Sequence, residues 1–208
     1  MMQLFDFHHH RKNSSGIYNL DLLCEAVPEQ FSAGIHPKDI DENYTRQLEW
    51  LEEISQHTQC IAIGECGLDG IVKTDYALQQ KVFREQLLMA EIRSKPVIIH
   101  CVRKHHDLPS FRKLSAVPMV IHGFNKNRNV AEDMLRHGFY LSFGNALLHN
   151  LSLQECFKKI PKDKFFLETD DSETKISAVY QKAAEIKGLS VIEIQMQTES
   201  NLKTITQL

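Results

Sequence analysis

Six side chains that can bind metal ions stand at the ends of short apolar runs. Two of them belong to the segment Asp6-Phe7-His8-His9-His10, in which His8 and His10 are two positions apart. Because alternate side chains of a strand share a face, these two imidazoles can hold one ion while His9 points away. The other four donors are Glu65, His100, His122 and Asp170.

Each of these four residues follows a run that is typical of a buried strand. Glu65 lies in the segment 64–69 between two glycines, directly after the apolar residues 60–63. The runs 96–100 and 118–122 both begin with proline and end with histidine, and the run 165–170 ends in acids. Two histidines in the same position of successive runs are harder to explain as coincidence than one.

Four imidazoles and two carboxylates are about what two divalent ions need, with one carboxylate bridging and positions left open for water. Oxygen and nitrogen donors without thiolate suit zinc, manganese or cobalt, and suit magnesium less well. We therefore predict two divalent metal ions, zinc, manganese or magnesium, as cofactors. The competing interpretation is that these side chains are polar strand ends or hydrogen-bonded core histidines.

Eight apolar, β-rich runs are the candidate strands that would position these groups. They alternate with segments of helical periodicity, as in a parallel sheet with helical crossovers. The pattern predicts the α/β class and a (β/α)8 TIM-type barrel, in which catalytic groups come from the carboxyl ends of several strands. A doubly wound open sheet is the alternative. The runs are residues 3–7, 17–20, 31–35, 60–64, 96–100, 118–122, 139–143 and 165–168, of which 17–20 is the weakest.

The helices between the runs are clearest at residues 75–93 and 127–137, each of which has one apolar stripe. Ser190 and Glu193 form a capping box that predicts a last helix, after Gly188 has ended the previous one. Only nine residues separate Phe7 from Ile17, too few for an ordinary crossover helix. We therefore expect a shortened barrel that lacks an early crossover helix, in a single domain over residues 1–208.

The composition is that of an ordinary globular chain. The 208 residues carry a formal net charge of −3, which argues against a strongly basic body that grips nucleic acid by charge alone. The five cysteines show no C-x-x-C spacing, so free thiols are expected. The first residues do not read as a signal peptide, and no run reaches the ~20 apolar residues of a membrane span. We expect a cytoplasmic protein with no membrane partner.

The order of these motifs resembles that of the TatD-related metal-dependent deoxyribonucleases, within the amidohydrolase-like barrel superfamily. Any one block alone is weak, but the ordered set is specific. The blocks are His8-x-His10, Gly34-Ile35-His36-Pro37, Gly64-Glu65-x-Gly67-Leu68-Asp69, Pro96-Val97-Ile98-Ile99-His100, His122-Gly123-Phe124, Gly138-Phe139-Tyr140-Leu141-Ser142 and Glu168-Thr169-Asp170.

The resemblance implies a divalent-metal-dependent hydrolase that cleaves DNA phosphodiester bonds with a metal-activated water. One ion would be held by His8, His10 and Asp170. The other would be held by His100 and His122, with Glu65 bridging the two. Asp170 and Glu65 are then the predicted catalytic residues, and Asp170 positions or deprotonates the water. DNA is the expected substrate, and no obligate protein partner is evident.

The chain departs from the family pattern in regions that would contact substrate. A helix is lost between His10 and Gly34, and the loop after Asp170 is short. Val102 stands where the family has an arginine, although Arg103 follows and could replace it. A hydrolase of a small amide, ester or phosphoester is therefore an alternative, as is a metal-bound interaction module without turnover.

Four further residues are candidates for contacts to the ligands or to the substrate, and each also has an ordinary structural interpretation. They could lie in the barrel interior, in a loop, at a helix cap or on a solvated helix start. Three other histidines, His57, His137 and His149, are predicted to be surface residues. The four candidates are Asp6, His36, Asp69 and Arg103.

Overall fold

The computed structural model describes residues 3–12 and 14–206. Within them, eight strands form one sheet in the order β1-β2-β3-β4-β5-β6-β7-β8. This sequential order is that of a (β/α)8 chain and not that of a doubly wound sheet, in which the strand order reverses. The strands are β1 Asp6–His9, β2 Gly16–Asn19, β3 Phe31–Ala33, β4 Cys60–Asp69, β5 Val97–Val102, β6 Met119–Ile121, β7 Tyr140–Phe143 and β8 Phe165–Leu167.

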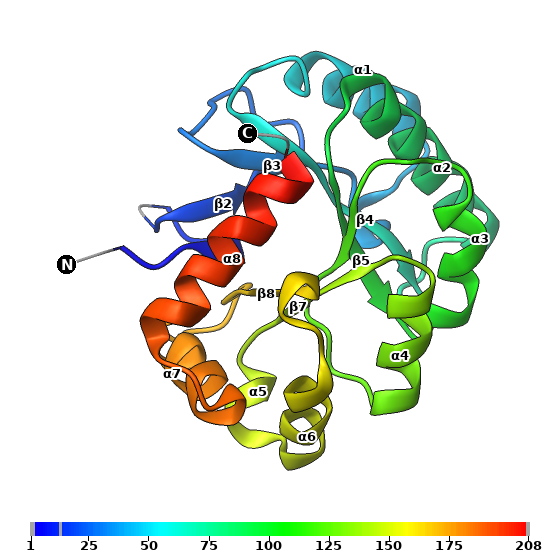
Figure 1. The fold of residues 1–208 in the computed structure, drawn as a ribbon. Helices are drawn as coiled ribbons and strands as arrows, with labels where there is room; N and C mark the ends of the chain where they lie inside the picture. The colour runs from blue at the N-terminus through cyan, green and yellow to red at the C-terminus, as the bar shows by residue number, and fades with distance from the viewer. Residues whose placement is uncertain (1–2, 13, 207–208) are drawn as a thin grey trace. The chain divides into compact units, whose positions relative to one another are not determined.

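Helices follow most of the strands (Figure 1). The α-helices are α1 Tyr44–Ile54, α2 Tyr76–Arg93, α3 Leu108–Arg112, α4 Arg128–Arg136, α5 Ala146–His149, α6 Leu151–Lys159, α7 Ile176–Lys187 and α8 Val191–Thr206. Short 3-10 helices are η1 Pro37–Asp39, η2 His105–Asp107 and η3 Lys162–Lys164.

The chain divides into two compact units, which we describe separately. Unit 1 contains Met1–Ile17 and His122–Leu208, and unit 2 is the continuous segment Tyr18–Ile121. The boundary therefore falls within β2 and again directly after β6.

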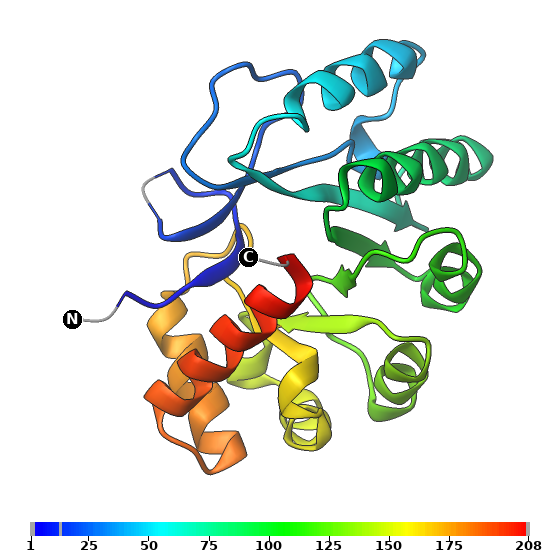
Figure 2. The same ribbon diagram turned by 45° about the horizontal axis from the view of Figure 1, so that its top comes forward.

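Unit 2 is built on parallel pairings from β2 to β6. Helix α2 packs on β4 through a buried stripe that includes Val82, Phe83 and Leu87, and α1 lies beside α2 (Figure 2). The helix begins where the side chain of Asp75 accepts a hydrogen bond from the Leu78 N–H at 2.9 Å, which satisfies one of the free amides of the first turn.

Unit 1 joins the two ends of the chain. Strand β7 pairs in parallel with β8, and a bridge between His9 and Asp170 connects β1 to the end of β8. The Phe7 and Phe166 rings stack between these strands with centroids 4.1 Å apart. Helix α8 packs on α7 (Figure 1), and the predicted capping box opens it, since the Ser190 N–H donates to Glu193 Oε2 at 2.8 Å.

The short early part of the chain is as predicted. No helix occurs among the described residues between β1 and β2, which are 10–12 and 14–15, or over residues 20–30 between β2 and β3. The (β/α)8 pattern therefore begins with two strands that are connected without crossover helices, and the prediction of a shortened barrel is confirmed.

Several boundaries differ from the prediction. The first strand is shifted from 3–7 to Asp6–His9, so His8 and His9 lie inside it. The fourth strand continues past Gly64 to Asp69, because residues 66–69 pair with β5. Among the described residues, no helix is long and apolar enough to cross a membrane.

Candidate metal sites

Unit 1 brings together four of the predicted donors. One ligand atom from each of His8, His122 and Asp170 lies within 4.8 Å of the others. Asp170 Oδ1 lies 3.7 Å from His8 Nε2 and 3.4 Å from His10 Nε2, and the His8 and His122 ring centroids are 4.5 Å apart. The sequence predicts His8 and His10 at the end of one strand, and His122 and Asp170 at the ends of two others. The fold of unit 1 brings these residues close together.

The backbone places Asp170 against strand β1. The Asp170 N–H donates to the His8 carbonyl at 2.9 Å, and the His10 N–H donates to the Asp170 carbonyl at 3.3 Å. Asp170 has a φ of 55°, in the left-handed region that aspartate tolerates better than most residues. The two hydrogen bonds hold this conformation, and the Asp170 carboxylate lies next to the imidazoles of His8 and His10.

Glu168 is a residue of this cluster that we did not predict as a site residue. It is fully buried, and its Oε1 accepts a hydrogen bond from the Gly123 N–H at 2.6 Å and lies 3.5 Å from His122 Nδ1. Its buried Oε2 has no hydrogen-bond partner among the described residues. A buried carboxylate oxygen without a partner is costly unless a cation is near. Glu168 and Asp170 are two positions apart and share one strand face, and this spacing could have identified Glu168 as a site residue.

Asp6 of β1 binds Thr169, the residue directly before Asp170. Its Oδ1 accepts from the Thr169 N–H at 2.9 Å, and its Oδ2 accepts from Thr169 Oγ1 at 2.6 Å. Burial raises the pKa of the Asp6 carboxyl to about 7, and the nearby Glu168 carboxylate acts in the same direction against the hydrogen bonds of Thr169. Asp6 therefore holds β8 to β1 next to the donors.

Unit 2 contains a second cluster of three residues of ligand type, one from the segment between β3 and η1 and one each from β4 and β5. Ligand atoms of His36, Glu65 and His100 lie within 4.8 Å of one another. Glu65 Oε1 is 2.8 Å from His100 Nδ1 and 3.4 Å from His36 Nε2, and the two imidazole centroids are 4.2 Å apart. Among the four additional candidates Asp6, His36, Asp69 and Arg103, His36 is the one that the structure groups with Glu65 and His100.

The tautomer of His36 follows from its other nitrogen. His36 Nδ1 accepts a hydrogen bond from the Lys38 N–H at 2.9 Å, so it carries no proton. The neutral imidazole then has its proton on Nε2, which faces Glu65. In this state His36 donates toward the Glu65 carboxylate and does not offer a lone pair to an ion.

His100 lies between two carboxylates. Its Nε2 is 2.9 Å from Asp69 Oδ2, on the side opposite to Glu65. Partial burial acts to raise the pKa of Asp69, but the hydrogen bonds from His100 and from the Ile71 N–H outweigh it and lower that pKa. When Nε2 donates to Asp69, the Nδ1 lone pair is left for an ion, as in other carboxylate–histidine–metal arrangements.

Two glycines allow the backbones of β3 and β4 to meet beneath this cluster. A Cβ atom on Gly34 would lie 2.6 Å from Gly64 Cα, so a side chain at Gly34 would push apart the backbone segments that carry His36 and Glu65. The Glu65 N–H donates to Asn19 Oδ1 at 2.9 Å. Asn19, from β2, is a second residue that the sequence did not single out, and no motif marked it.

The remaining candidates lie outside the clusters. Arg103 is exposed, in a turn after β5 with a φ of 58°. His57, His137 and His149 are exposed, as predicted. His9 is buried, and its burial lowers its pKa to about 4, together with the charge of His8.

Both clusters fit a divalent cation. Their donors are imidazole nitrogens and carboxylate oxygens, and donor atoms about 2 Å from one ion lie roughly 3 Å from each other. The separations of 3.4 and 3.7 Å around Asp170 Oδ1 are close to this spacing.

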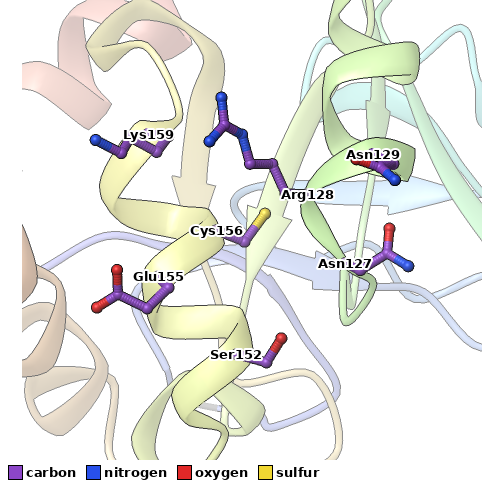
Figure 3. A pocket seen from close by; sticks show the side chains of 7 residues that line it. All are labelled: Asn127, Arg128, Asn129, Ser152, Glu155, Cys156 and Lys159. Carbon is purple, nitrogen blue, oxygen red and sulfur yellow. The ribbon is translucent and has the colours of Figure 1, made fainter.

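A cavity of about 360 Å³ lies elsewhere in unit 1, between α4 and α6 (Figure 3). Arg128, which lines it, is paired through Nε with Glu132 Oε1 at 2.5 Å, so its charge is compensated. None of the predicted site residues lines this cavity. The lining residues are Asn127, Arg128, Asn129, Ser152, Glu155, Cys156 and Lys159.

Comparison with curated proteins finds metal-dependent hydrolases. The chain is 30% identical over 194 residues to an uncharacterized metal-dependent hydrolase, YabD, of Bacillus subtilis, which covers 84% of this chain and 76% of that protein. It is 31% identical over 160 residues to a protein named 3'-5' ssDNA/RNA exonuclease TatD in Pectobacterium carotovorum, with 72% of this chain and 61% of that protein covered. The chain therefore spans less than two thirds of the named exonuclease.

Solved structures show the same fold. The crystal structure of YJJV, a TatD homologue from Escherichia coli, superposes with a TM-score of 0.74 at 23% identity and covers 86% of this chain and 77% of that chain. This likeness supports the TIM-type barrel class. The family model described as TatD related DNase matches residues 14–207, a span that includes Glu65, His100, His122 and Asp170 and begins after His8 and His10. With this match over most of its length, the chain belongs to the TatD-related family of metal-dependent hydrolases.

Proposed function

We propose that this protein hydrolyses phosphodiester bonds of DNA with two divalent metal ions, zinc, manganese or magnesium. The observation that carries the proposal is the pair of donor clusters, each made of imidazoles and carboxylates. The family and the exonuclease name of one relative support DNA as the substrate class.

The two clusters would hold the ions with different donors. In unit 1 the donors are His8, His10, His122 and Asp170. In unit 2 they are Glu65 and His100, with His36 as a hydrogen-bond donor to Glu65. The bridging role of Glu65 and the sharing of one ion by His100 and His122 stay predictions, as does a single domain over residues 1–208.

Bound divalent ions would supply Lewis acidity toward a phosphoryl oxygen and would lower the pKa of a bound water. Asp170 is the group that we propose accepts the proton of the attacking water. Its side chain is 36% exposed, so its carboxylate is open to solvent while its backbone is held by β1. Glu168 and Asp69 would keep His122 and His100 in fixed orientations.

A hydrolase of small esters, amides or phosphoesters is the second candidate. The connection from Asp170 to α7 at Ile176 is only a short turn, so little chain is available there to contact a long substrate. The chain is also weakly acidic, with a net charge of −3.

One assay separates these functions. Metal-loaded protein is incubated with single-stranded and double-stranded DNA and with a panel of small esters, amides and phosphodiesters. The variants are His100→Ala, which loses a donor of unit 2, and His57→Ala, which removes an exposed histidine of the same unit. DNA loss with wild type and His57→Ala, but not with His100→Ala, supports the proposal.

If a small substrate is hydrolysed and DNA is not, the result would favour the second candidate. If no substrate is hydrolysed, the result would favour a metal-bound interaction module. Undiminished DNA hydrolysis by His100→Ala at unchanged metal content would refute the assignment of this site.

A further inference from the structure

Two glutamines of α2 lie on one buried face of the helix and point toward the cluster of unit 2. Gln79 and Gln86 are seven positions apart, which places them on the same side of an α-helix, and each is only 1% exposed. Most of this face is apolar, and buried glutamine is uncommon unless its amide is fully bonded.

Gln86 pairs with both backbone groups of Ile35. Its Oε1 accepts from the Ile35 N–H at 2.7 Å, and its Nε2 donates to the Ile35 carbonyl at 3.1 Å. Strand β3 ends at Ala33, so these buried backbone groups lie beyond its ladder. The amide of Gln86 thereby replaces a neighbouring strand at the residue directly before His36.

Gln79 makes the same arrangement at the other side of the cluster. Its Oε1 accepts from the Asp69 N–H at 2.8 Å, and its Nε2 donates to the Asp69 carbonyl at 3.1 Å and to the Thr74 carbonyl at 2.9 Å. Asp69 is the residue whose carboxylate lies 2.9 Å from His100 Nε2. A shift of this backbone would move the carboxylate away from the imidazole.

We propose that Gln79 and Gln86 are positioning residues that set the metal affinity of the unit 2 cluster, by clamping the backbone of Asp69 and Ile35. Their amides hold His36 and Asp69 at fixed distances from Glu65 and His100 without touching an ion or a substrate. The inference rests on the proposed function only in taking this cluster to hold an ion, and it does not depend on the substrate.

The test measures Zn²⁺ affinity by competition with a chromophoric chelator, alongside the melting temperature of the metal-free protein. Gln79→Met and Gln86→Met keep the length of the side chain and remove every hydrogen bond of the amide, three at Gln79 and two at Gln86. We expect each to weaken Zn²⁺ binding at the cluster by about 10- to 100-fold, the effect typical of partners that orient metal ligands. His100→Ala identifies which part of the binding curve belongs to this cluster.

Gln195→Met is the matched control. Gln195 of α8 is 2% exposed and donates to the Gln3 carbonyl in unit 1, so its loss should lower the melting temperature and leave the Zn²⁺ affinity of the unit 2 cluster unchanged. If Gln79→Met and Gln86→Met lower the melting temperature as Gln195→Met does but bind Zn²⁺ like wild type, the proposal is wrong.

Gln86→Glu provides a variant that keeps the shape of the side chain. A protonated carboxyl can accept from the Ile35 N–H and donate to its carbonyl, whereas an ionised one can only accept. We expect its Zn²⁺ affinity relative to wild type to approach parity at mildly acidic pH and to fall at alkaline pH. A ratio that does not change with pH would overturn the proposal, even if Gln86→Met fails to fold. Because no readout uses DNA, a failure of the proposed hydrolysis would leave this result intact.

Discussion

Unit 1 and unit 2 hold their donors in different ways. In unit 1 the side chains of His10 and Asp170 are 32% and 36% exposed, and the cluster contains the imidazoles of His8, His10 and His122 with the carboxylates of Asp170 and Glu168. In unit 2 the side chains of Glu65 and His100 are only 8% and 16% exposed, and carboxylates lie on both sides of His100.

The difference points to separate tasks for the two clusters. The Asp170 carboxylate is partly exposed and can contact water, while hydrogen bonds to the backbone of His8 and His10 hold its own backbone in place. Buried donors such as Glu65 are oriented by side-chain hydrogen bonds and by the helix behind them. We infer that unit 1 contributes more to the chemical step and unit 2 more to the tight retention of an ion.

The largest effect is expected from removing two donors of one unit at a time. The double variants His8→Ala/Asp170→Ala and Glu65→Ala/His100→Ala should each lose nearly all hydrolysis and about half of the bound metal, because each removes two donors of one proposed cluster. Metal per chain, measured by mass spectrometry after gel filtration, checks this. Equal loss of all metal in both double variants would show that the units do not bind independently.

Asp170→Asn tests whether unit 1 supplies the chemical step. The amide cannot accept a proton but keeps the size and polarity of the side chain, so kcat should fall by about 10²- to 10⁴-fold. Metal content should change much less. Asp171→Asn, at the exposed neighbouring residue, is the control and should behave like wild type. A kcat near that of wild type in Asp170→Asn would assign the proton acceptor to another group.

Asp69→Asn tests retention in unit 2. The Asp69 carboxylate accepts from the Ile71 N–H with Oδ1 and lies within hydrogen-bond distance of His100 Nε2 with Oδ2. Asparagine has only one side-chain oxygen in place of these two, so His100 would be held less firmly in its orientation. Metal affinity should fall by about 10- to 100-fold. Asp75→Asn is a suitable control because asparagine also caps a helix well. If chelator competition finds the same affinity for Asp69→Asn and wild type, Asp69 does not support the ion.

The smallest effect is a contrast in pH dependence between two carboxyls of the metal-free protein. The folded pKa of Asp6 in unit 1 is raised from 3.8 to about 7, so the unfolded chain loses this proton first. The free energy of unfolding of wild type, relative to Asp6→Asn, should therefore fall as the pH rises from about 4 to about 7.

Asp69 in unit 2 should show the opposite sign. Its folded pKa lies below 3.8, so its contribution is present above that value and is lost as the pH falls through the folded pKa. Denaturant unfolding of wild type, Asp6→Asn and Asp69→Asn from about pH 2 to about pH 7 measures both. Parallel pH curves for the three proteins would contradict the contrast.

The sequence predicts the fold well because its strands are continuous apolar runs. The runs around Ile63, Ile98 and Val120 each become a strand, and the stops at Gly188 and the cap at Ser190 are found where the pattern places them. Helices α1 and α6 were not identified in advance, although both are amphipathic. The apolar positions of α1 are few, and only Gln47, Leu51 and Ile54 are buried in it.

The donor residues were predictable, but their supporting contacts were not. His8 and His10 could be paired from strand alternation alone. The roles of Glu168, Asn19 and the two glutamines of α2 depend on which backbone groups lie opposite them in space. These pairings join residues as far apart as Ile35 and Gln86, and local spacing carries no information about them.

The two units also differ in when their parts leave the ribosome. Every strand partner within Tyr18–Ile121 is made in one continuous stretch, so this segment can begin to fold during synthesis. Strand β1 is made first, but its hydrogen bonds to Asp170 and Thr169 must wait until most of the chain exists. A nascent chain that stops before β8 therefore lacks Asp170 and the bonds that β1 makes to it, although all of Tyr18–Ile121 has by then been synthesised.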